Sequence, residues 1–497
     1  MMSPNSLSSL RKFIQLLIAG AILLAPQFME AEIHYVQAAT TDTVCRFGIT
    51  SPLGSEGYDI ATIGVGSYLD WGAVTNPSLP EGVEYIRVLR LRNDLYPQTL
   101  ANLHAWVQAN PGGVWVVGNE PDTTYEDQDA LLPEVYADRF YELATIIRRL
   151  DPSARIAFGS IVQPTPIRMR YLDRAWNELV ARAGGSAAAS KLIDFWSIHA
   201  FILNEQVMSW GTGVPPGFEN DHADAVIITN FDDTHSIAIF QQRMLAFRSW
   251  MANKGERSKP LWITEYGSLF PPIDPNGNPN YFGITDEISA DYMVATFDFL
   301  LGASDAQTGL PADGNQLVQR WFWYSLNEHR YKFGGSVYNP DYPNFGPRIT
   351  LVGQQFIGYQ SNLAQPDLFP VSLSILPVLY NSNHTLVNYR LDITIGNNQY
   401  DDASCAQVWI YDGDPGSGGT LIAGPIPSSA IHSYFGNGIV SAYWMGVQPG
   451  AQHTLFVRVG PIGVSDTNPG NNQASFIVDT DLPRLHFLPI IHHQILQ

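Results

Sequence analysis

The sequence is poor in cysteine and shows no metal-binding pattern. Only two cysteines, Cys45 and Cys405, occur in 497 residues, and they lie far apart along the chain. No cluster of histidine and cysteine has the spacing of a zinc site, so we expect neither a metal nor another cofactor. The two cysteines can form a disulfide only if their segments lie close together, which the sequence leaves open.

Basic residues are also few. Lysine and arginine number 27 against 47 aspartates and glutamates, which gives a formal net charge of -20 at pH 7. Such a chain lacks the basic surface that nucleic-acid binding requires, and its charge disfavours a polyanionic substrate. Hydrophobic residues make up 45% and charged residues 15%, which is a globular composition. The 12 tryptophans and 23 tyrosines suit sugar-binding clefts and large β-rich cores equally.

The apolar run at the N-terminus, Phe13–Pro26, is too short to cross a bilayer comfortably. Arg11 and Lys12 precede it, small residues follow it, and Val36–Ala38 fits a cleavage site. We therefore expect residues 1–39 to be a secretory signal peptide and the mature protein to be extracellular without a membrane span. An uncleaved anchor is the alternative.

From Cys45 to about Gln360, short apolar runs alternate with helical segments, which is typical of a parallel sheet with crossover helices. Eight strands over about 320 residues predict an α/β fold, a (β/α)₈ TIM barrel, across residues 40–362. The expected strands are Arg46–Thr50, Val65–Trp71, Tyr85–Arg92, Val114–Asn119, Ile156–Ile161, Phe195–Phe201, Leu261–Glu265 and Trp321–Ser325.

The connections between these strands differ in kind. After the fourth strand, an apolar stripe with spacings of three and four from Tyr136 to Leu150 predicts a helix that Asp151-Pro152 ends. Asn76–Pro80 leaves no room for a helix between the second and third strands. The segment Asn204–Ser236, rich in Gly, Pro and Asp, reads as an insertion over the barrel mouth.

Beyond about Leu363 the pattern changes to alternating segments, such as Val387–Ile395, Ala406–Tyr411 and His453–Val459. Turn residues separate them, which predicts an all-β immunoglobulin-like sandwich over residues 371–480 after a linker at 363–370. The apolar tail at 481–497 reads either as an edge strand or as a cell-surface sorting tail. We expect a monomer, with cell-surface attachment as an open alternative.

Two segments place a glutamate where a strand ends. Trp115–Asp122 carries Glu120 at the end of the fourth strand, and Leu261–Gly267 carries Glu265 at the end of the seventh. Barrel active sites lie at this end of the strands, and these two strands lie roughly across the barrel from each other. Two carboxylates there can lie about 5 Å apart, the separation that a retaining glycosidase needs.

The pair suits this chemistry because one carboxyl group must protonate the leaving oxygen while the other attacks the anomeric carbon. Two like charges close together raise one pKa, so an acid and a base can coexist at one pH. Either glutamate alone is as well explained by a salt bridge or a helix-end charge. Both together, in these strands and this order, favour catalysis.

Asn119-Glu120 on strand four with Glu265 on strand seven resembles clan A glycoside hydrolases. Within this clan the chain is most similar to the "glycosyl hydrolase catalytic core" group, which includes endo-β-1,3-glucanases. The resemblance spans roughly residues 46–359, and Ala200 replaces the first of the two aromatic residues usual after the strand-six histidine. Further matching segments are Tyr68–Trp71, Gly118–Asp122, Ser197–Phe201, Pro260–Glu265 and Arg320–Tyr324.

The resemblance implies that Glu120 is the acid/base, that Glu265 is the nucleophile and that Asn119 hydrogen-bonds the sugar 2-OH. It also implies that Trp323 forms the floor of a sugar subsite, where the alternative is a core tryptophan. His199, at the end of strand six, would orient Glu265 or a substrate hydroxyl, and a buried structural histidine is equally compatible.

Two more aromatic residues and two arginines complete the expected site. Tyr68 and Trp71 are weaker candidates for sugar platforms. In Val88–Arg92 the leucines alternate with arginines, so the leucines should face the helices and the arginines the barrel interior. We expect Arg92 near the rim carboxylates and Arg90 one layer deeper, with a structural ion pair to Asp94 or another acid as the alternative.

The C-terminal segment resembles the CARDB (cell-adhesion-related) sandwich at Trp409–Pro415, Gly418–Ile422 and Asn468–Ala474. This resemblance implies an accessory or spacer module. Asp412 and Asp414 suit calcium, but Asp-Gly-Asp-Pro is more often a turn.

The sequence thus predicts a retaining hydrolase of neutral β-glycans, with β-1,3-glucan as one candidate and a polysaccharide or oligosaccharide as its partner. One alternative is an exo-acting β-glycosidase or β-xylosidase, because the Asn204–Ser236 insertion could block one end of the cleft. Another is a non-catalytic, cell-surface carbohydrate-binding protein on a barrel scaffold.

Overall fold

The structure is a computed structural model. It describes residues 41–42, 46–74, 77–80, 83–125, 127–271, 282–339, 341–344, 346–361, 366–380, 385–397, 402–403, 406–428, 437–461, 466 and 468–480. The expected signal peptide, both cysteines and the tail at 481–497 lie outside the described residues.

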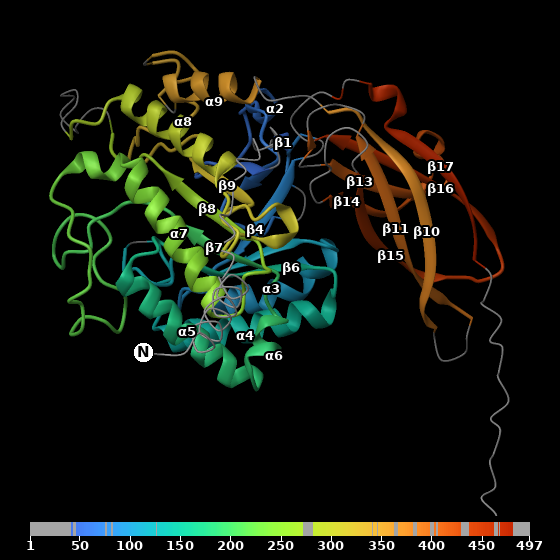
Figure 1. Ribbon diagram of the computed structural model, residues 1–497, viewed down its shortest axis with the longest axis horizontal. Helices are drawn as coiled ribbons and strands as arrows, with labels where there is room; N and C mark the ends of the chain where they lie inside the picture. Colours follow the sequence, from blue (N-terminus) through green and yellow to red (C-terminus); the bar gives the residue numbers. More distant parts are fainter. Residues whose placement is uncertain are drawn as a thin grey trace, which may run out of the picture. The chain divides into compact units, whose positions relative to one another are not determined.

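Eight parallel strands close into a barrel in chain order, with the last strand pairing with the first (Figure 1). They overlap the eight ranges expected from the sequence, so the TIM barrel is confirmed. The strands are β2 (Phe47–Thr50), β3 (Ser67–Leu69), β4 (Glu84–Leu89), β5 (Val114–Val117), β6 (Arg155–Ile161), β7 (Phe195–His199), β8 (Leu261–Gly267) and β9 (Arg320–Tyr324).

Helices surround these strands in Figure 1. The predicted helix after the fourth strand is α4, where Pro133 occupies the first turn and the stripe containing Tyr136, Phe140 and Ile147 is buried. The helices are α2 (Ile60–Ile63), α3 (Tyr96–Ala109), α4 (Pro133–Leu150), α5 (Pro166–Ala183), α6 (Ser186–Ser190), α7 (Ile237–Asn253), α8 (Asp286–Gly302) and α9 (Leu351–Ser361).

Two connections behave as the sequence predicts. The described residues between β3 and β4 contain no helix, and the fully described insertion Asn204–Ser236 contains one short 3₁₀ segment, η2 (Phe231–His235). The insertion begins beyond the carboxyl end of β7, the end at which barrel enzymes bind substrates.

Alternate residues of each barrel strand face opposite sides. One set packs inside the barrel, as Ile86, Val88 and Phe322 do. The other set packs between the strands and the helices, as Leu89, Trp321 and Trp323 do. Because side chains alternate along a strand, the side chain at its carboxyl end enters the barrel mouth only if it belongs to the inward-facing set.

The C-terminal region consists of two antiparallel sheets, which confirms the expected β-sandwich. Strand β10 begins at Leu368, inside the segment expected as a linker. One sheet contains β10 (Leu368–Tyr380), β11 (Val387–Asn397) and β15 (Asn437–Val447), and the other contains β14 (Thr420–Pro427), β13 (Ala406–Asp412), β16 (Gln452–Pro461) and β17 (Gln473–Asp479). A two-residue parallel pair joins β1 (Thr41–Asp42) to β12 (Asp402–Ala403).

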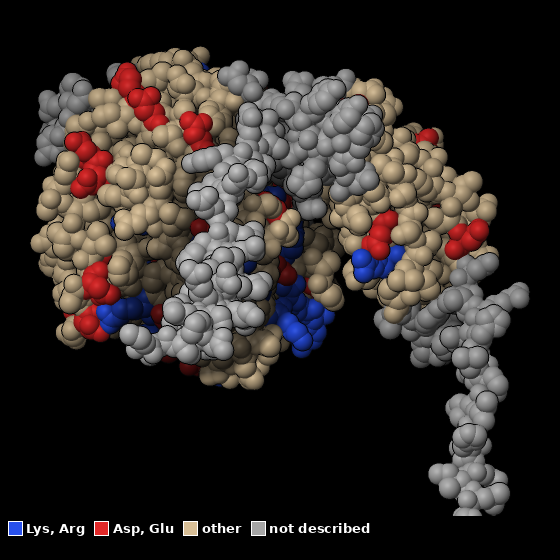
Figure 2. All heavy atoms as spheres, in the orientation of Figure 1, with Lys and Arg blue, Asp and Glu red and all other residues tan. Residues whose placement is uncertain are grey.

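The described helices include none that is both long and apolar enough to cross a bilayer. On the face drawn in Figure 2, most of the described surface is uncharged and its charged side chains are scattered. The small share of charged surface agrees with the charged fraction of 15% in the sequence.

Candidate active site

Glu120 stands just beyond the carboxyl end of β5 in an unusual backbone conformation. Gly118 has φ 95°, and a Cβ there would meet the Tyr136 ring at 2.8 Å, so only glycine fits between the strand and α4. Glu120 has φ 43°, a left-handed value that is costly for a residue with a Cβ. Its backbone N–H donates to the Ser160 carbonyl at 3.0 Å, which holds the turn against β6.

Glu265 reaches the barrel mouth because β8 contains a bulge. Ile198 pairs with Ile263, but the next residue, His199, pairs with Glu265, so Thr264 is an extra residue in β8. The Thr264 hydroxyl contacts Ser197 inside the barrel at 2.7 Å, and the following side chain, Glu265, also points inward. A bulge re-aims side chains in this way.

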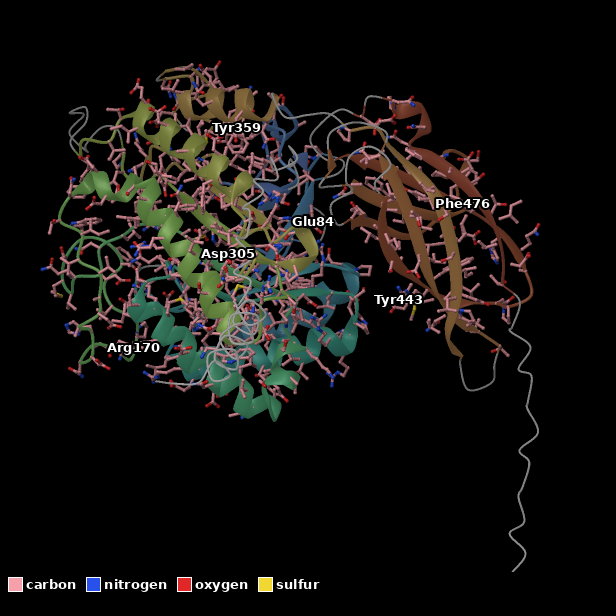
Figure 3. The ribbon with its side chains drawn as sticks, viewed as in Figure 1. Glu84, Arg170, Asp305, Tyr359, Tyr443 and Phe476 are labelled. Atoms are coloured by element: carbon pink, nitrogen blue, oxygen red, sulfur yellow. The ribbon has the colours of Figure 1, made fainter. Side chains whose placement is uncertain are left out.

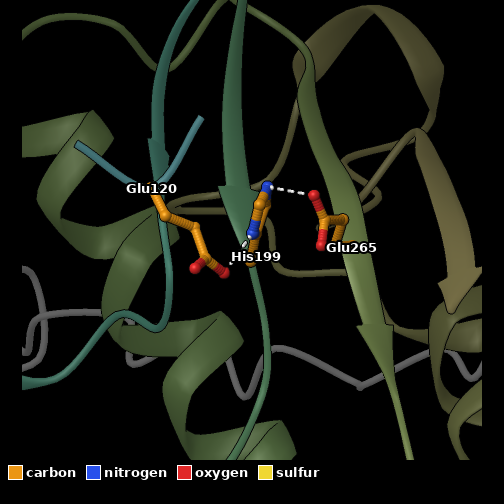
Figure 4. A group of neighbouring side chains, drawn as sticks. All are labelled: Glu120, His199 and Glu265. Carbon is orange, nitrogen blue, oxygen red and sulfur yellow. Dashed lines mark hydrogen bonds and ion pairs between the residues drawn. The ribbon is translucent and has the colours of Figure 1, made fainter. Parts of the chain in front are cut away.

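His199 lies between the two glutamates (Figure 4). Its Nδ1 is 2.8 Å from Oε1 of Glu120, and its Nε2 is 3.3 Å from Oε1 of Glu265. Each residue offers one ligand atom, and these three atoms all lie within 4.8 Å of one another. All three side chains are buried. The structure therefore brings together three residues that the sequence predicts for the site.

Burial and mutual charge set the protonation of this group. Burial, together with the negative charge of Glu120, raises the pKa of Glu265 to about 7, while His199 and Trp71 act in the opposite direction. Burial alone would lower the pKa of His199, but the charges of Glu265 and Glu120 raise it. The Glu265 carboxyl group therefore titrates near neutral pH in this site.

Aromatic side chains line the carboxylates. Trp71, at φ 57° beyond β3, donates its indole N–H to Oε1 of Glu265 at 2.5 Å. Its ring lies 5.8 Å from that of Tyr324, which in turn lies 6.0 Å from Phe201. Phe201 is 6.3 Å from the His199 ring. Trp71 thus belongs to the site as a partner of Glu265, whereas Tyr324 and Phe201 were not predicted as site residues.

Two predicted aromatic platforms are not brought to the site. Trp323 is fully buried between the barrel strands and the helices, where it contacts Tyr266 and donates its indole N–H to the Gly335 carbonyl at 2.7 Å. On β9 the inward positions are Phe322 and Tyr324, so Tyr324 takes the place expected for Trp323. Tyr68 is likewise fully buried outside the barrel interior, with no surface to offer a sugar.

The arginines also differ from expectation. Leu89 and Leu91 face the helices as predicted. Arg92 lies past the end of the strand, where it pairs with Asp94 at 2.7 Å, which is the alternative considered from the sequence, and with Asp127. Arg90 is the arginine whose charge lowers the pKa of Glu265, and its guanidinium pairs with the buried Asp129 at 3.0 Å.

Asn119 is buried beside Glu120, and both its side-chain amide and its backbone N–H are hydrogen-bonded. Its side-chain amide donates to Gln128 at 2.6 Å, and its backbone N–H donates to Asp129 at 2.7 Å. Asp129 also accepts the backbone N–H groups of Leu91 and Arg92, so it joins the ends of β4 and β5. No sequence pattern marked Asp129 or Gln128, because both lie in a loop without periodicity.

Glu120, His199 and Glu265 also form the group of described residues best placed to hold a metal ion. Their arrangement does not fit a shared ion well, because each histidine nitrogen faces a different carboxylate. The arrangement fits proton sharing among two carboxyl groups and an imidazole.

No family model and no curated protein matches the chain. Among solved structures, an oligosaccharide-binding GH128 (subgroup VII) protein from Cryptococcus neoformans is similar at 14% identity, over 66% of this chain and 98% of that chain, with a TM-score of 0.36. The endo-β-1,4-mannanase from Thermotoga petrophila is similar at 12% identity, over 84% and 93%, with a TM-score of 0.33. The CARDB domain of a Pyrococcus furiosus protein, in complex with di-metal ions, is similar at 20% identity over 23% of this chain and 88% of that chain, with a TM-score of 0.17. Similarity at this level of identity and TM-score carries no information on the activity of this chain.

Proposed function

We propose that the protein is a retaining glycoside hydrolase that cleaves β-glycosidic bonds of a neutral glycan. The observation that carries this proposal is the pair of buried carboxylates, Glu120 and Glu265, with one oxygen of each within 4.8 Å at the carboxyl end of the barrel. A separation near 5 Å is typical of retaining enzymes, whereas inverting enzymes need room for a water molecule between their carboxyl groups.

In the first step, Glu265 attacks the anomeric carbon and the bond from that carbon to the leaving oxygen breaks. Glu120 transfers its proton to the leaving oxygen, so the departing sugar is released as an alcohol. The product is a glycosyl ester on Glu265. Because Oε1 of Glu265 faces Trp71 and His199, Oε2 is the oxygen that attacks.

In the second step, Glu120 takes a proton from water and the resulting hydroxide oxygen bonds to the anomeric carbon. The ester bond to Glu265 breaks, and Glu120 again holds a proton. The sum is one glycosidic bond and one water converted into two sugar hydroxyls. Two displacements on opposite faces keep the anomeric configuration.

Neighbouring groups suit these roles. The indole N–H of Trp71 stabilises the ionised form of Glu265, which the attack requires. His199 Nδ1 lies 2.8 Å from Oε1 of Glu120, where the imidazole can share the proton that Glu120 transfers to the leaving oxygen. The rings of Trp71, Tyr324 and Phe201 supply apolar walls that suit sugar C–H faces. The net charge of -20 favours a neutral glycan, with β-1,3-glucan among the candidates.

A second candidate is oligosaccharide binding without hydrolysis. One observation favours it: Oε1 of Glu120 and Oε1 of Glu265 are both engaged by His199, which ties the two carboxylates together. In this case the site would bind a neutral oligosaccharide and leave its bonds intact.

The deciding experiment measures reducing sugars released from β-glucans, xylan, mannan and galactan by the parent, Glu265→Gln and Glu84→Gln proteins. Release by the parent and Glu84→Gln but not by Glu265→Gln supports the proposal, and NMR of the first product should show the retained anomer. An inverted product would refute the double displacement. Binding without release, measured by calorimetry on oligosaccharides from the same polymers, would favour the second candidate.

The role of Glu120 has its own test in Glu120→Gln. The kcat/KM for the natural glycan should fall by roughly 10²- to 10⁴-fold, because the leaving oxygen loses its proton donor. A dinitrophenyl glycoside of the same sugar needs no such donor and should keep most of its kcat/KM. An equal loss on both substrates would contradict the acid role.

A further inference from the structure

Arg168, in the first turn of α5, is fully buried among groups that the mechanism does not use. Its guanidinium pairs with Asp122 at 2.6 Å and with Glu205 at 2.9 Å, and all three side chains are 0% exposed. Asp122 is two residues after Glu120, and Glu205 is the second residue of the Asn204–Ser236 insertion. One side chain thus joins the acid/base loop to the insertion.

Every N–H of this guanidinium has an acceptor. Nε donates to Glu205, and Nη1 donates to both the carboxylate and the backbone carbonyl of Asp122. Nη2 donates to the Thr212 hydroxyl at 3.0 Å and to the Gly213 carbonyl at 2.7 Å. An arginine offers five N–H groups in a rigid planar fork, so the positions of these acceptors are tightly defined.

The insertion is attached to this cluster at two places. At its start, Glu205 also accepts from Gln163 at 2.8 Å and from the backbone N–H of Val226 at 2.7 Å. Farther along, the Thr212 hydroxyl donates to that of Thr123 at 2.8 Å. The insertion therefore contacts Asp122 through Arg168 and contacts Thr123 directly.

The same contacts support the unusual backbone of Glu120. A left-handed φ at a glutamate persists only when its surroundings define it. Thr123 donates its N–H to the Glu120 carbonyl at 3.3 Å, and Tyr171, one turn after Arg168 on α5, donates to the Pro121 carbonyl at 3.2 Å. The three residues after Glu120 are thus fixed by α5 and the insertion.

The buried charges compensate one another. Burial alone would lower the pKa of Arg168, but Asp122 and Glu205 together raise it, so the guanidinium stays charged. Arg243 adds a second positive charge that interacts with Glu205, and it donates to the Phe201 carbonyl at 2.7 Å. Two carboxylates and two guanidinium groups give a neutral cluster, as full burial requires.

We propose that Arg168 is a positioning residue for acid/base catalysis, which holds the Glu120–Thr123 loop against the insertion and so sets the geometry of the Glu120 carboxyl group. The inference rests on the proposed function. It makes the insertion part of the acid/base machinery, in contrast to a cap that only blocks one end of the cleft.

The test compares Arg168→Lys, which keeps the charge but loses the fork, with Thr212→Val, which removes one acceptor at constant shape. Arg182→Lys is the matched control, because Arg182 lies on the same helix and pairs with Asp138 at 2.6 Å near the surface. Kinetics use the polysaccharide that the panel identifies and the dinitrophenyl glycoside of its sugar. Thermal unfolding establishes that each variant is folded.

Arg168→Lys should lower kcat/KM for the polysaccharide by about 10- to 100-fold, because the proton donor is displaced, with a loss of less than about 3-fold on the dinitrophenyl glycoside. Thr212→Val should show the same bias at smaller size, and Arg182→Lys no bias. Equal losses on both substrates, or no loss in folded Arg168→Lys, would overturn the proposal. If Arg168→Lys does not fold, an unbiased Thr212→Val overturns it.

Hydrogen–deuterium exchange separates this inference from the proposed function. Arg168→Lys should speed exchange both in residues 121–125 and in residues 204–213, relative to Arg182→Lys. Faster exchange in both segments supports the coupling even if the parent hydrolyses nothing, in which case only the proposed function fails. Faster exchange in one segment alone would overturn the coupling.

Discussion

Each end of the barrel holds a carboxylate with little exposure to solvent, but the neighbours of the two carboxylates differ. At the amino end, Glu84, Arg155 and Arg320 are the first residues of β4, β6 and β9. Glu84, which is labelled in Figure 3, pairs with both arginines. At the carboxyl end, Glu265 faces a second carboxylate, Glu120, with a histidine between them.

The difference in partners gives opposite pKa shifts. Burial raises the pKa of Glu84, but the charges of Arg155 and Arg320 outweigh burial and hold it below its usual value. Burial raises the pKa of Glu265 to about 7, because a neighbouring carboxylate adds to the effect. A fully paired carboxylate stabilises the barrel, whereas an incompletely paired one keeps the proton chemistry that catalysis uses.

The largest expected effect is a difference in kcat between glutamate-to-glutamine variants at the two ends of the barrel. Glu265→Gln should lower kcat by roughly 10⁴-fold, because the amide cannot form the glycosyl ester. Glu84→Gln makes the same chemical change at the other end and should leave kcat within about 3-fold of the parent at a temperature where both are folded. Steady-state kinetics on one polysaccharide measures both. Comparable losses in the two variants would remove the functional distinction.

The second effect concerns the free energy of unfolding at the amino end of the barrel. Glu84→Gln should lower the free energy of unfolding by about 1–3 kcal/mol, because the buried Arg320 and the half-buried Arg155 lose their carboxylate. Because the pKa of Glu84 is lowered in the folded state, its contribution is present above the unfolded pKa and is lost as the pH falls through the folded pKa. Urea unfolding at pH 7 and pH 3 therefore should show a smaller difference between parent and variant at pH 3. A difference independent of pH would contradict the pairing.

The sequence was sufficient for features that depend on local pattern. Short apolar runs between helical segments placed all eight barrel strands, and a glutamate where a strand ends pointed to both Glu120 and Glu265. The apolar stripe of α4 and the lack of a helix before β4 were also visible, because helix periodicity and proline are local signals.

The remaining features depend on register and on long-range contacts. Tyr324 faces inward in place of Trp323 because Phe322 packs inside the barrel and side chains alternate along β9, and the apolar run Trp321–Tyr324 does not reveal which face is inward. The contact between Trp71 and Glu265 joins residues 194 positions apart. The role of Asp122 depends on its partner Arg168, which lies 46 residues away on another element.

The third effect concerns the hydrogen bond from Trp71 to Glu265 at the carboxyl end of the barrel. Trp71→Phe should lower kcat/KM by roughly 10- to 100-fold, because a hydrogen bond to a charged group is lost. Losing the donor should raise the pKa of Glu265, so the acid limb of the pH profile should move to higher pH. Trp115→Phe is the matched control, since its buried indole N–H has no hydrogen-bond partner within the described part of the chain. A lower kcat/KM with an unmoved limb would mean that Trp71 acts only through packing.

The smallest effect concerns the stability of the carboxyl end. The folded pKa of Glu265 lies above its unfolded value, so its stabilising contribution is present below the unfolded pKa and is lost as the pH rises through about 7. Glu265→Gln removes this charge, so at pH 8 it should raise the free energy of unfolding by on the order of 1–2 kcal/mol relative to the parent. At pH 4.5 the gain should disappear, because the parent carboxyl group is then protonated. Urea unfolding at both pH values measures it, and equal stability of parent and variant at pH 8 would mean that His199 and Trp71 compensate the buried charge fully.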